Sequence, residues 1–579
     1  MSNSLFRKKN IHNILAEEEA KGGGHLKRVL TAKDLTFFGI AAILGAGSFS
    51  SLGSAVFNGG PGVVLLFVIT AIACGFTALC YSEFASRIPI AGSAYTYAYA
   101  SFGELFAWII GWALIMEYSI GNIYVAYSWS DYFTSLVGKM GFHIPEYFCT
   151  SYMEAKHAVN GGSTNPEVIA AWNNAPIVGG IRMIVDIPAL VINLLITYLV
   201  YRGIKESRNL SNIMVILKLG IVILIIIVGG YLIFSNSLSY NWLPANDEGV
   251  KSFMPNGFGG VMMAVSSVFF AYIGFDAVSV LAEESKNPQR DLPKGMILSL
   301  VICTVVYILL TLVLTGAVHY KNFDGVGDPL AFIFEAQNLN VSWMQVLVAI
   351  TAVIAMTSVL LVFQMGQPRM WMSMSRDGLM PPAFQKIHSK FKTPSFATII
   401  TGLVVGIPII FTDKTFVLDF TSIATLFAFV LVCGGVLLIP RKEKQSGRFH
   451  LPYINGQFIF PIIVVTSFIV AHTLSGTYFS EMFNFDFSGS DDYATGKASF
   501  MDLATSKISL IVFWFIAILL AIGAFLKKYS LIPLMGVITC LYLLTGMSKS
   551  NWAWFIGWLA LGLLLYFLYG YRKSKLAVN

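Results

Sequence analysis

The sequence predicts an all-α polytopic membrane protein, and composition and segment length are the two observations behind this prediction. The 579 residues are 56% hydrophobic and 12% charged, with a mean hydropathy of +0.71. A soluble domain carries about 25% charged residues. Hydropathy gives about fourteen apolar segments of roughly 20 residues, the length that crosses a bilayer. We place them at 35–56, 62–84, 104–134, 184–202, 210–233, 257–282, 295–319, 341–366, 395–411, 417–440, 457–477, 507–527, 530–547 and 552–570.

Two of these segments are interrupted by residues that do not favour a continuous helix. Gly45-Ala46-Gly47-Ser48 interrupts the first segment, and Ala271-Tyr272-Ile273-Gly274-Phe275-Asp276 interrupts the sixth. Unpaired backbone groups cost several kcal/mol each in hydrocarbon, so such breaks persist where they line a cavity enclosed by protein. Two broken helices at matching positions of two halves indicate the substrate site of a secondary transporter.

The spacing of the breaks predicts an internal repeat. They fall in the first and sixth segments, so each half has five spans and the second half begins on the opposite side of the membrane, which is an inverted-topology repeat. Four further spans follow as a peripheral addition. We therefore expect a cytoplasmic tail, a first repeat with one outside loop, a second repeat, and a peripheral region with a second outside loop: 1–34, 35–235 (loop 139–183), 236–440 and 441–579 (loop 479–505).

The net charge of +7 is explained by membrane orientation rather than by a nucleic-acid partner. Most Lys and Arg fall in segments that share one side if both termini are cytoplasmic, as the positive-inside rule requires. No presequence is visible, which favours a bacterial inner membrane. The six Cys show no metal or disulfide spacing. No nucleophile–base pair, phosphate loop or metal cluster indicates an enzyme, so we expect neither a metal nor a cofactor.

The polarity of the half-helices predicts the chemistry of the ligand. With the N-terminus inside, the first half of each broken helix ends in free carbonyls and the second half begins with free amides. Helix N-termini favour anions and C-termini favour cations. The carboxylate and ammonium groups of an α-amino acid match these two kinds of end without any charged side chain.

Long motifs around the breaks and the loops resemble a known family. They are Leu26-Lys27-Arg28-Val29-Leu30 with Gly39 to Gly47, Phe269 to Asp276 with Glu283 to Pro288, Gly366-Gln367-Pro368-Arg369 with Ser375 to Pro381, and Pro533 to Tyr571. These runs resemble transporters of the amino acid–polyamine–organocation (APC) superfamily, closest to the cationic amino acid transporter (CAT) family of bacterial type. The resemblance implies a LeuT-like five-plus-five fold with broken helices 1 and 6 that works by alternating access. Ser48 departs from the family pattern, where Ile is more usual.

The resemblance also implies the substrate-binding residues. The carboxylate would meet backbone at Ile43, Ala46 and Gly47, and the ammonium group would meet the carbonyls of Phe270, Ala271 and Ile273. Phe270 would also close over the substrate as a lid. Met356 in the eighth span is a candidate wall that disfavours arginine, with a core or lipid-facing Met as the alternative. The break residues Gly45, Ser48 and Gly274 complete the expected site.

Two ionisable residues lie deep in apolar spans, which makes each a functional hypothesis. Lys218 is in the fifth span, where similar transporters hold a lysine in place of a sodium ion, bonded to carbonyls of the first break and to Thr357 or Ser358. We therefore expect proton coupling and no sodium coupling. Glu117 in the third span is a second candidate proton carrier. The alternative for Lys218 is a static internal charge. The alternatives for Glu117 are a counter-charge, a group that faces a cationic substrate side chain, and a protonated structural carboxyl.

The sequence thus predicts a proton-coupled symporter of L-amino acids, embedded in a lipid bilayer. Glu283 and Arg376 are candidate members of a cytoplasmic gate, with solvated loops as the alternative. A sodium-independent exchanger and an amino acid sensor remain alternative functions. Neutral versus cationic substrates, the oligomeric state and a small membrane subunit stay open at this stage.

Overall fold

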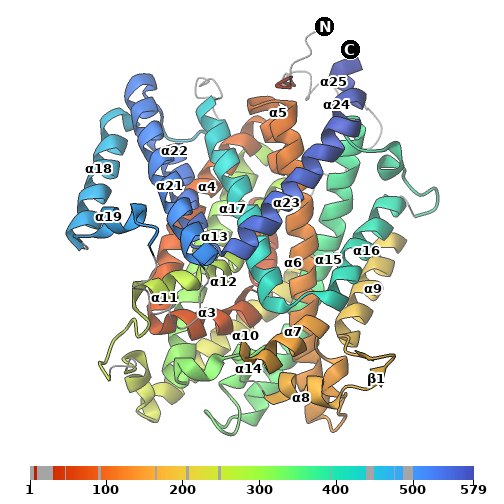
Figure 1. Cartoon of the computed structure of the whole chain (residues 1–579). Helices are drawn as coiled ribbons and strands as arrows, with labels where there is room; N and C mark the ends of the chain where they lie inside the picture. The colour runs from red at the N-terminus through yellow and green to blue at the C-terminus, as the bar shows by residue number, and fades with distance from the viewer. Residues whose placement is uncertain are drawn as a thin grey trace.

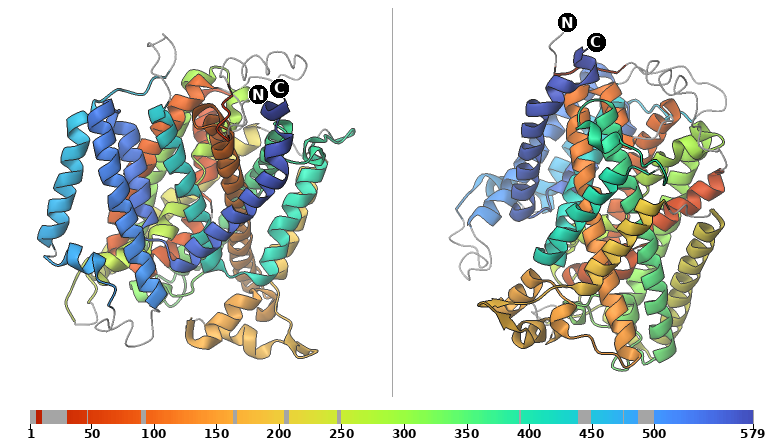
Figure 2. Two further views of the ribbon diagram at one scale, coloured as in Figure 1. Left: turned by 45° about the horizontal axis from the view of Figure 1, so that its top comes forward. Right: turned by 90° about the vertical axis from the view of Figure 1, so that its right-hand side faces the viewer.

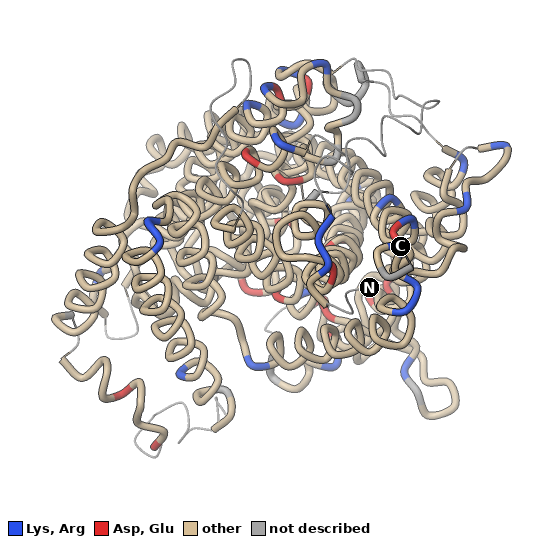
Figure 3. The backbone as a smooth tube through the Cα atoms, turned by 90° about the horizontal axis from the view of Figure 1, so that it is seen from above, with Lys and Arg blue, Asp and Glu red and all other residues tan. Residues whose placement is uncertain are grey.

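The computed structural model is a bundle of long helices with both termini at one end and a small cap at the other (Figures 1 and 2). The structure describes residues 5–9, 30–45, 47–88, 93–162, 166–203, 208–245, 249–391, 393–438, 449–474, 476–486 and 500–578. Figure 3 shows how sparse the charges are, since most of the tube carries uncharged residues. This arrangement agrees with the low charge content of the sequence.

A helix, or a series of shorter helices at a break, occupies each predicted apolar segment. Besides the cap, the described part of residues 30–235 contains α2 (Ala32–Ile43), η1 (Gly47–Ser51), α3 (Leu52–Gly59), η2 (Gly60–Gly62), α4 (Val63–Arg87), α5 (Ser93–Ser101), α6 (Glu104–Lys139), α9 (Ile187–Arg202) and α10 (Arg208–Ser235). The described part of residues 236–438 contains η5 (Leu238–Trp242), α11 (Gly257–Met263), α12 (Val265–Phe270), η6 (Asp276–Glu284), α13 (Pro288–Ala317), η7 (Tyr320–Phe323), α14 (Pro329–Phe332), α15 (Ser342–Arg376), η8 (Pro382–Gln385), α16 (Ser395–Phe411) and α17 (Lys414–Leu438). The last part holds α18 (Gly456–Leu474), α19 (Tyr478–Phe483), α21 (Phe500–Lys527), α22 (Leu531–Leu544), α23 (Lys549–Leu565), η9 (Tyr566–Gly570), α24 (Tyr571–Lys573) and α25 (Lys575–Val578).

The lengths of these helices confirm a polytopic helical membrane protein. Within the described residues, nine helical runs are long and apolar enough to cross a bilayer, and α9, α16 and α22 are shorter apolar helices. The membrane-spanning stretch of α6 is 89% buried inside the protein, whereas the corresponding stretches of α18 and α21 are each 17% buried. Figure 1 accordingly shows α18 at the edge of the bundle, and α6 lies inside it.

The segment predicted as the first outside loop forms a small cap at the end opposite the termini (Figure 2). It contains η3 (Glu146–Phe148), α7 (Tyr152–His157), η4 (Ala158–Gly162), α8 (Pro166–Asn174) and an antiparallel hairpin of β1 (Ile177–Val178) and β2 (Ile181–Arg182). The cap has its own apolar cluster around Ala155, Ala171 and Ile184. The described part of the cap therefore packs around an apolar cluster of its own.

Glu104, at the start of α6, joins the C-terminal segment to the bundle. Its carboxylate is completely buried and accepts hydrogen bonds from the hydroxyls of Tyr99 (3.2 Å), Tyr566 (3.0 Å) and Ser574 (2.5 Å). A buried carboxylate is stable only when hydrogen bonds satisfy its oxygens, and these three hydroxyls do so.

Glu104→Ala is expected to destabilise the folded protein by about 2 kcal/mol, because three buried hydroxyls lose their common acceptor. The thermal-unfolding midpoint of the purified protein in detergent measures this. Tyr566→Phe, which removes one of the three donors, should have a smaller effect. A Glu104→Ala midpoint equal to that of the wild type would contradict the role of this cluster.

Candidate functional site

The two predicted breaks are present and face each other in the middle of the bundle. α2 ends at Ile43 and a π-helical turn begins at Gly47, while α12 ends at Phe270 and a 3₁₀ helix begins at Asp276. A Cβ atom added to Gly47 would lie 2.5 Å from the Cα atom of Ala271. Only glycine permits this approach, so position 47 must be a glycine for the backbone of the second break to pack against it.

Gly274 makes the reciprocal contact from the second break. Its φ of +114° is a conformation that residues with a side chain rarely adopt. A Cβ atom there would lie 3.0 Å from the backbone carbon of Ala42. The two breaks therefore cross at their backbones, and each depends on a glycine.

Tyr307 of α13 connects the two breaks. Its buried hydroxyl lies 2.8 Å from the carbonyl oxygen of Ile43 and 2.7 Å from that of Ala271. A hydroxyl carries one hydrogen, so the two carbonyls share it, and each carbonyl oxygen keeps a second lone pair for another donor. The Ala271 carbonyl can thus still accept from an ammonium group.

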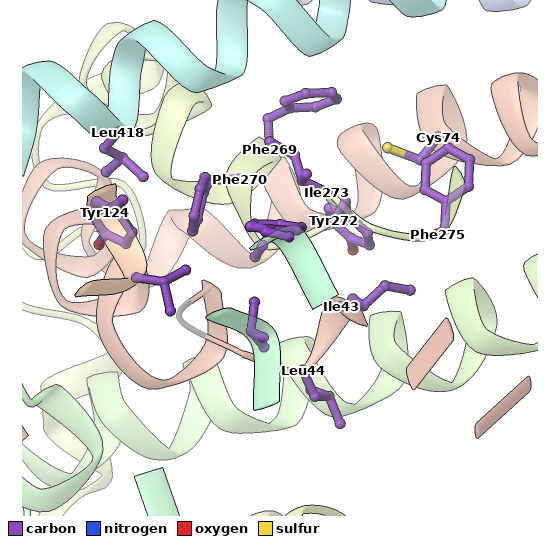
Figure 4. Packing of buried hydrophobic residues seen from close by; sticks show 14 of the residues in the cluster. Ile43, Leu44, Cys74, Tyr124, Phe269, Phe270, Tyr272, Ile273, Phe275 and Leu418 are labelled. Atoms are coloured by element: carbon purple, nitrogen blue, oxygen red, sulfur yellow. The ribbon is translucent and has the colours of Figure 1, made fainter. Parts of the chain in front are cut away.

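A small cavity lies against both breaks. Its lining comes from α2, η1, α6, α12, the residues after α12, and α15: Ala42, Ile43, Gly47, Val125, Phe270, Ile273, Val359 and Phe363. Figure 4 shows Ile43 and Ile273 near the crossing and Phe270 beside Tyr124. Four of the predicted site residues, Ile43, Gly47, Phe270 and Ile273, are thus brought to one cavity.

Other predicted break residues support the cavity without lining it. A Cβ atom on Gly45 would lie 2.5 Å from Cγ2 of Val359, so Gly45 packs against the cavity wall. Ser48 is buried, and its hydroxyl donates to the Gly45 carbonyl (3.0 Å). The Ser48 hydroxyl therefore closes the break locally. Ala46 lies outside the described residues.

Met356 is buried but is not among the residues that line this cavity. Val359 and Phe363 line it from the same helix. Met356 shares a face of α15 with Phe363 but lies about 10 Å from it along the helix axis, at 1.5 Å per residue. Val359, three residues after Met356, is the nearer of the two lining residues, at about 4.5 Å along the axis. The role of Met356 as a wall of the substrate site stays a prediction.

Lys218 of α10 is where the resemblance implied. The residue is 1% exposed, and its ammonium group donates to the Ser358 hydroxyl (2.6 Å) and to the Ala41 carbonyl in the last turn of α2 (3.4 Å). A second small cavity adjoins it, lined by Phe38, Ala41, Met214, Val215, Lys218, Ser358 and Val362. Thr357, the other candidate partner, instead accepts a hydrogen bond from Trp129 (3.0 Å).

Glu117 of α6 is buried at 4% exposure, and Asp276 at the start of η6 is buried at 3%. Asp276 is the charged residue that acts on Glu117 most strongly. The third span and the second break therefore each carry a buried carboxyl group, and the charge of Asp276 acts on Glu117. Sequence reasoning identified Glu117 and treated Asp276 only as part of the break.

The predicted cytoplasmic gate pair is not defined by the structure. The side chain of Glu283 lies outside the described residues, and Arg376 is exposed. The neighbouring residue Asp377 is instead the one in contact, pairing with Lys9 (2.6 Å) and accepting from the Tyr95 hydroxyl (2.7 Å). The role of Glu283 and Arg376 remains a prediction.

Glu154 lies on α7 of the cap, and the charges of Asp131, Lys414 and Asp413 act on it. Desolvation, with the neighbouring Asp131, raises the pKa of Glu154 from its usual 4.5 to about 7. Because its pKa is higher in the folded protein, the contribution of this carboxyl group to stability is fully present below about pH 4.5 and is lost as the pH rises through about 7. Glu154→Gln should reduce the change of the thermal-unfolding midpoint with pH between about 4.5 and 7. A midpoint that depends on pH as it does in the wild type would contradict the raised pKa of Glu154.

The comparison with known proteins decides the family. A family model described as amino acid permease matches residues 30–485. This chain belongs to that amino acid permease family. The expected resemblance to APC superfamily and CAT-like transporters is thereby confirmed, and the chain is a transporter rather than an enzyme.

Three similar relatives illustrate the range of the family. The branched-chain amino acid permease BcaP of Bacillus subtilis (strain 168) is 41% identical over 77% of this chain and 88% of that protein. The methylthioribose transporter of the same strain is 38% identical over 79% and 90%. The vacuolar cationic amino acid transporter 2 of Arabidopsis thaliana is 30% identical over 99% and 93%. Amino acid transport is therefore the activity that the family and most of these names share.

Proposed function

We propose that this permease imports L-amino acids with apolar, branched side chains across the bacterial inner membrane, by proton-coupled symport. The cavity at the two crossing breaks carries this proposal. It combines backbone groups at two helix breaks, which suit a zwitterion, with side chains that are all apolar. Alternating access would use a five-plus-five inverted repeat, with four peripheral spans and both termini cytoplasmic, giving fourteen spans in all.

The walls of the cavity favour a neutral substrate. Val125, Val359 and Phe363 line it opposite the breaks, and no Asp or Glu is among its lining residues. The cationic side chain of arginine or lysine would lose its hydration there without an anionic partner, which costs several kcal/mol. The name of the relative BcaP supports a branched-chain substrate.

The buried ionisable residues support proton coupling. Lys218 supplies a cation between α2, α10 and α15, where the resemblance implies that sodium-dependent relatives bind their ion, so sodium is not needed. Glu117 and Asp276 are two buried carboxyl groups, and the negative charge of Asp276 acts on Glu117, which suits Glu117 to carrying a proton. An exchanger or a sensor remains the alternative function if no gradient drives uptake.

Uptake into proteoliposomes tests the proposal. Labelled leucine, arginine and methylthioribose are offered under an inward proton gradient and, separately, under an inward sodium gradient. The proposal predicts that leucine accumulates with the proton gradient alone and that arginine and methylthioribose do not. If methylthioribose is the preferred substrate, the proposal of a branched-chain amino acid substrate is wrong. If leucine is taken up only with sodium, or only in exchange for preloaded leucine, the proposal of proton coupling is wrong.

A further inference from the structure

Lys414 and Asp131 form an ion pair at the outer end of the bundle, above the cavity. Asp131 lies on α6 near the cap, and Lys414 is the first residue of α17. The Lys414 ammonium donates to the Asp131 carboxylate. Their side chains are 16% and 30% exposed, so the pair is partly shielded from solvent. The pair therefore ties the outer end of α17 to that of α6.

A chain of contacts connects this ion pair to the cavity. The Lys414 ammonium lies 5.6 Å from the centre of the Tyr124 ring, a cation–π contact. The Tyr124 and Phe270 rings meet edge to face with their centres 4.6 Å apart, and Phe270 lines the cavity. Tyr124 and Asp131 lie two turns apart on one face of α6. The order from outside inward is thus ion pair, Tyr124, Phe270 and cavity.

The segment before α14 packs against Asp131 of the same ion pair. A Cβ atom on Gly327 would lie 2.5 Å from Oδ2 of Asp131, so the backbone of this segment rests against the carboxylate. The Gly327 carbonyl accepts a hydrogen bond from Ser50 (3.1 Å), and the Tyr124 hydroxyl donates to the Ser50 hydroxyl (3.4 Å). Asp131 therefore touches α17 through Lys414 and the α14 segment through Gly327.

We propose that the Asp131–Lys414 pair is the latch of the outer gate, and that Lys414 is a positioning residue which holds Tyr124 against the Phe270 lid. This inference rests on the proposed transport function and adds the element that keeps the outer pathway closed. Breaking the pair frees Tyr124 and the lid, so the population shifts toward the state that is open to the outside. A substrate offered from outside then binds more readily, while closure over it becomes less favourable.

The direct test is thiol accessibility from outside in the absence of substrate. Leu418 lies one turn below Lys414, is 3% exposed, and is seen close to Tyr124 in Figure 4. Leu418→Cys is combined with Cys149→Ser, because the other five cysteines are buried. The full-length protein in proteoliposomes is labelled with a membrane-impermeant maleimide. Lys414→Met should raise the labelling rate about five-fold, and Gly327→Ala, which displaces Asp131, should act in the same direction.

Controls separate the latch from a general loss of structure. Lys414→Arg, which keeps both the ion pair and the cation–π contact, should label at the wild-type rate. The charge swap Asp131→Lys with Lys414→Asp restores the ion pair but not the cation–π contact with Tyr124, so its rate should lie between those of the wild type and Lys414→Met. Asp131→Lys alone should raise the rate. Lys9→Met breaks an ion pair of similar exposure at the opposite end and should leave the rate unchanged. In uptake assays, Lys414→Met should lower the external KM for leucine and also lower Vmax.

Two results would overturn the latch. One is an unchanged labelling rate in Lys414→Met. The other is a rate that rises equally in Lys414→Met and in the charge-swapped protein. Because labelling needs no substrate, its failure is distinguishable from failure of the proposed function, which the uptake panel tests by itself.

Discussion

Lys218→Ala is expected to abolish uphill uptake while substrate binding remains measurable. The lysine contacts Ser358 and Ala41 and is not among the residues that line the cavity at the breaks. Its loss should therefore remove coupling rather than substrate contact. Without coupling, a proton gradient no longer drives the substrate, and the accumulation ratio falls to about 1.

The measurement pairs leucine accumulation in proteoliposomes with equilibrium leucine binding in detergent. Lys386→Ala, an exposed lysine in the segment after α15, is the matched control and should behave as the wild type. Wild-type accumulation by Lys218→Ala would show that the lysine is only an internal structural charge. Loss of binding together with accumulation would show that it acts on the site directly.

Gly47→Ala is expected to abolish both binding and transport. The added Cβ atom would lie 2.5 Å from the Cα atom of Ala271, which belongs to backbone and cannot rotate away. The two breaks would have to separate, and the Tyr307 bridge between the Ile43 and Ala271 carbonyls would be lost. Leucine affinity should fall by at least about 100-fold, since the loss of well-oriented backbone contacts costs several kcal/mol.

Gly75→Ala is the matched control for this substitution. Gly75 lies in α4, and an added Cβ atom there would have no heavy atom within 4 Å. It should therefore bind leucine as the wild type does. A Gly47→Ala protein with normal leucine affinity would mean that the breaks do not need to cross at their backbones.

The breaks were predictable because glycine leaves a local signal in the sequence. Gly47 and Gly274 stand inside apolar runs where a glycine weakens a helix, so each marks a place where backbone approaches backbone. Lys218 was predictable for a related reason, because a charge within an apolar span requires a partner. Its contact with Ser358 followed from the resemblance and is present in the structure.

The walls of the cavity were not predictable in the same way. Val359, Phe363 and Met356 are all apolar residues of one long helix, and sequence does not say which turn of a buried helix lies level with the breaks. Tyr307 likewise lies far from both breaks along the chain, and only the packing of α13 brings its hydroxyl to them. Contacts of this kind depend on tertiary packing, for which a single sequence holds no local signal.

The pairing of the charged residues of the proposed latch could not be predicted from the sequence either. Asp131 and Lys414 lie near the ends of their spans, where a charge is normally solvated and needs no partner. Their pairing depends on how α17 begins beside α6. The sequence predicted a gate at the cytoplasmic side because the expected topology gathers charged residues such as Glu283 and Arg376 there, and it gave no such cluster for Asp131 and Lys414.

The central claim is that the two breaks bind the ammonium and carboxylate groups of a substrate whose side chain is apolar. Competition against labelled leucine by 4-methylpentanoate, 3-methylbutylamine and arginine tests it most directly, using purified protein at equilibrium. Each of the first two compounds keeps the branched side chain and lacks one charged group. The account predicts that each competes about 10- to 100-fold more weakly than leucine, and that arginine also competes weakly. Competition as strong as that of leucine by either single-charge analogue, or by arginine, would contradict it.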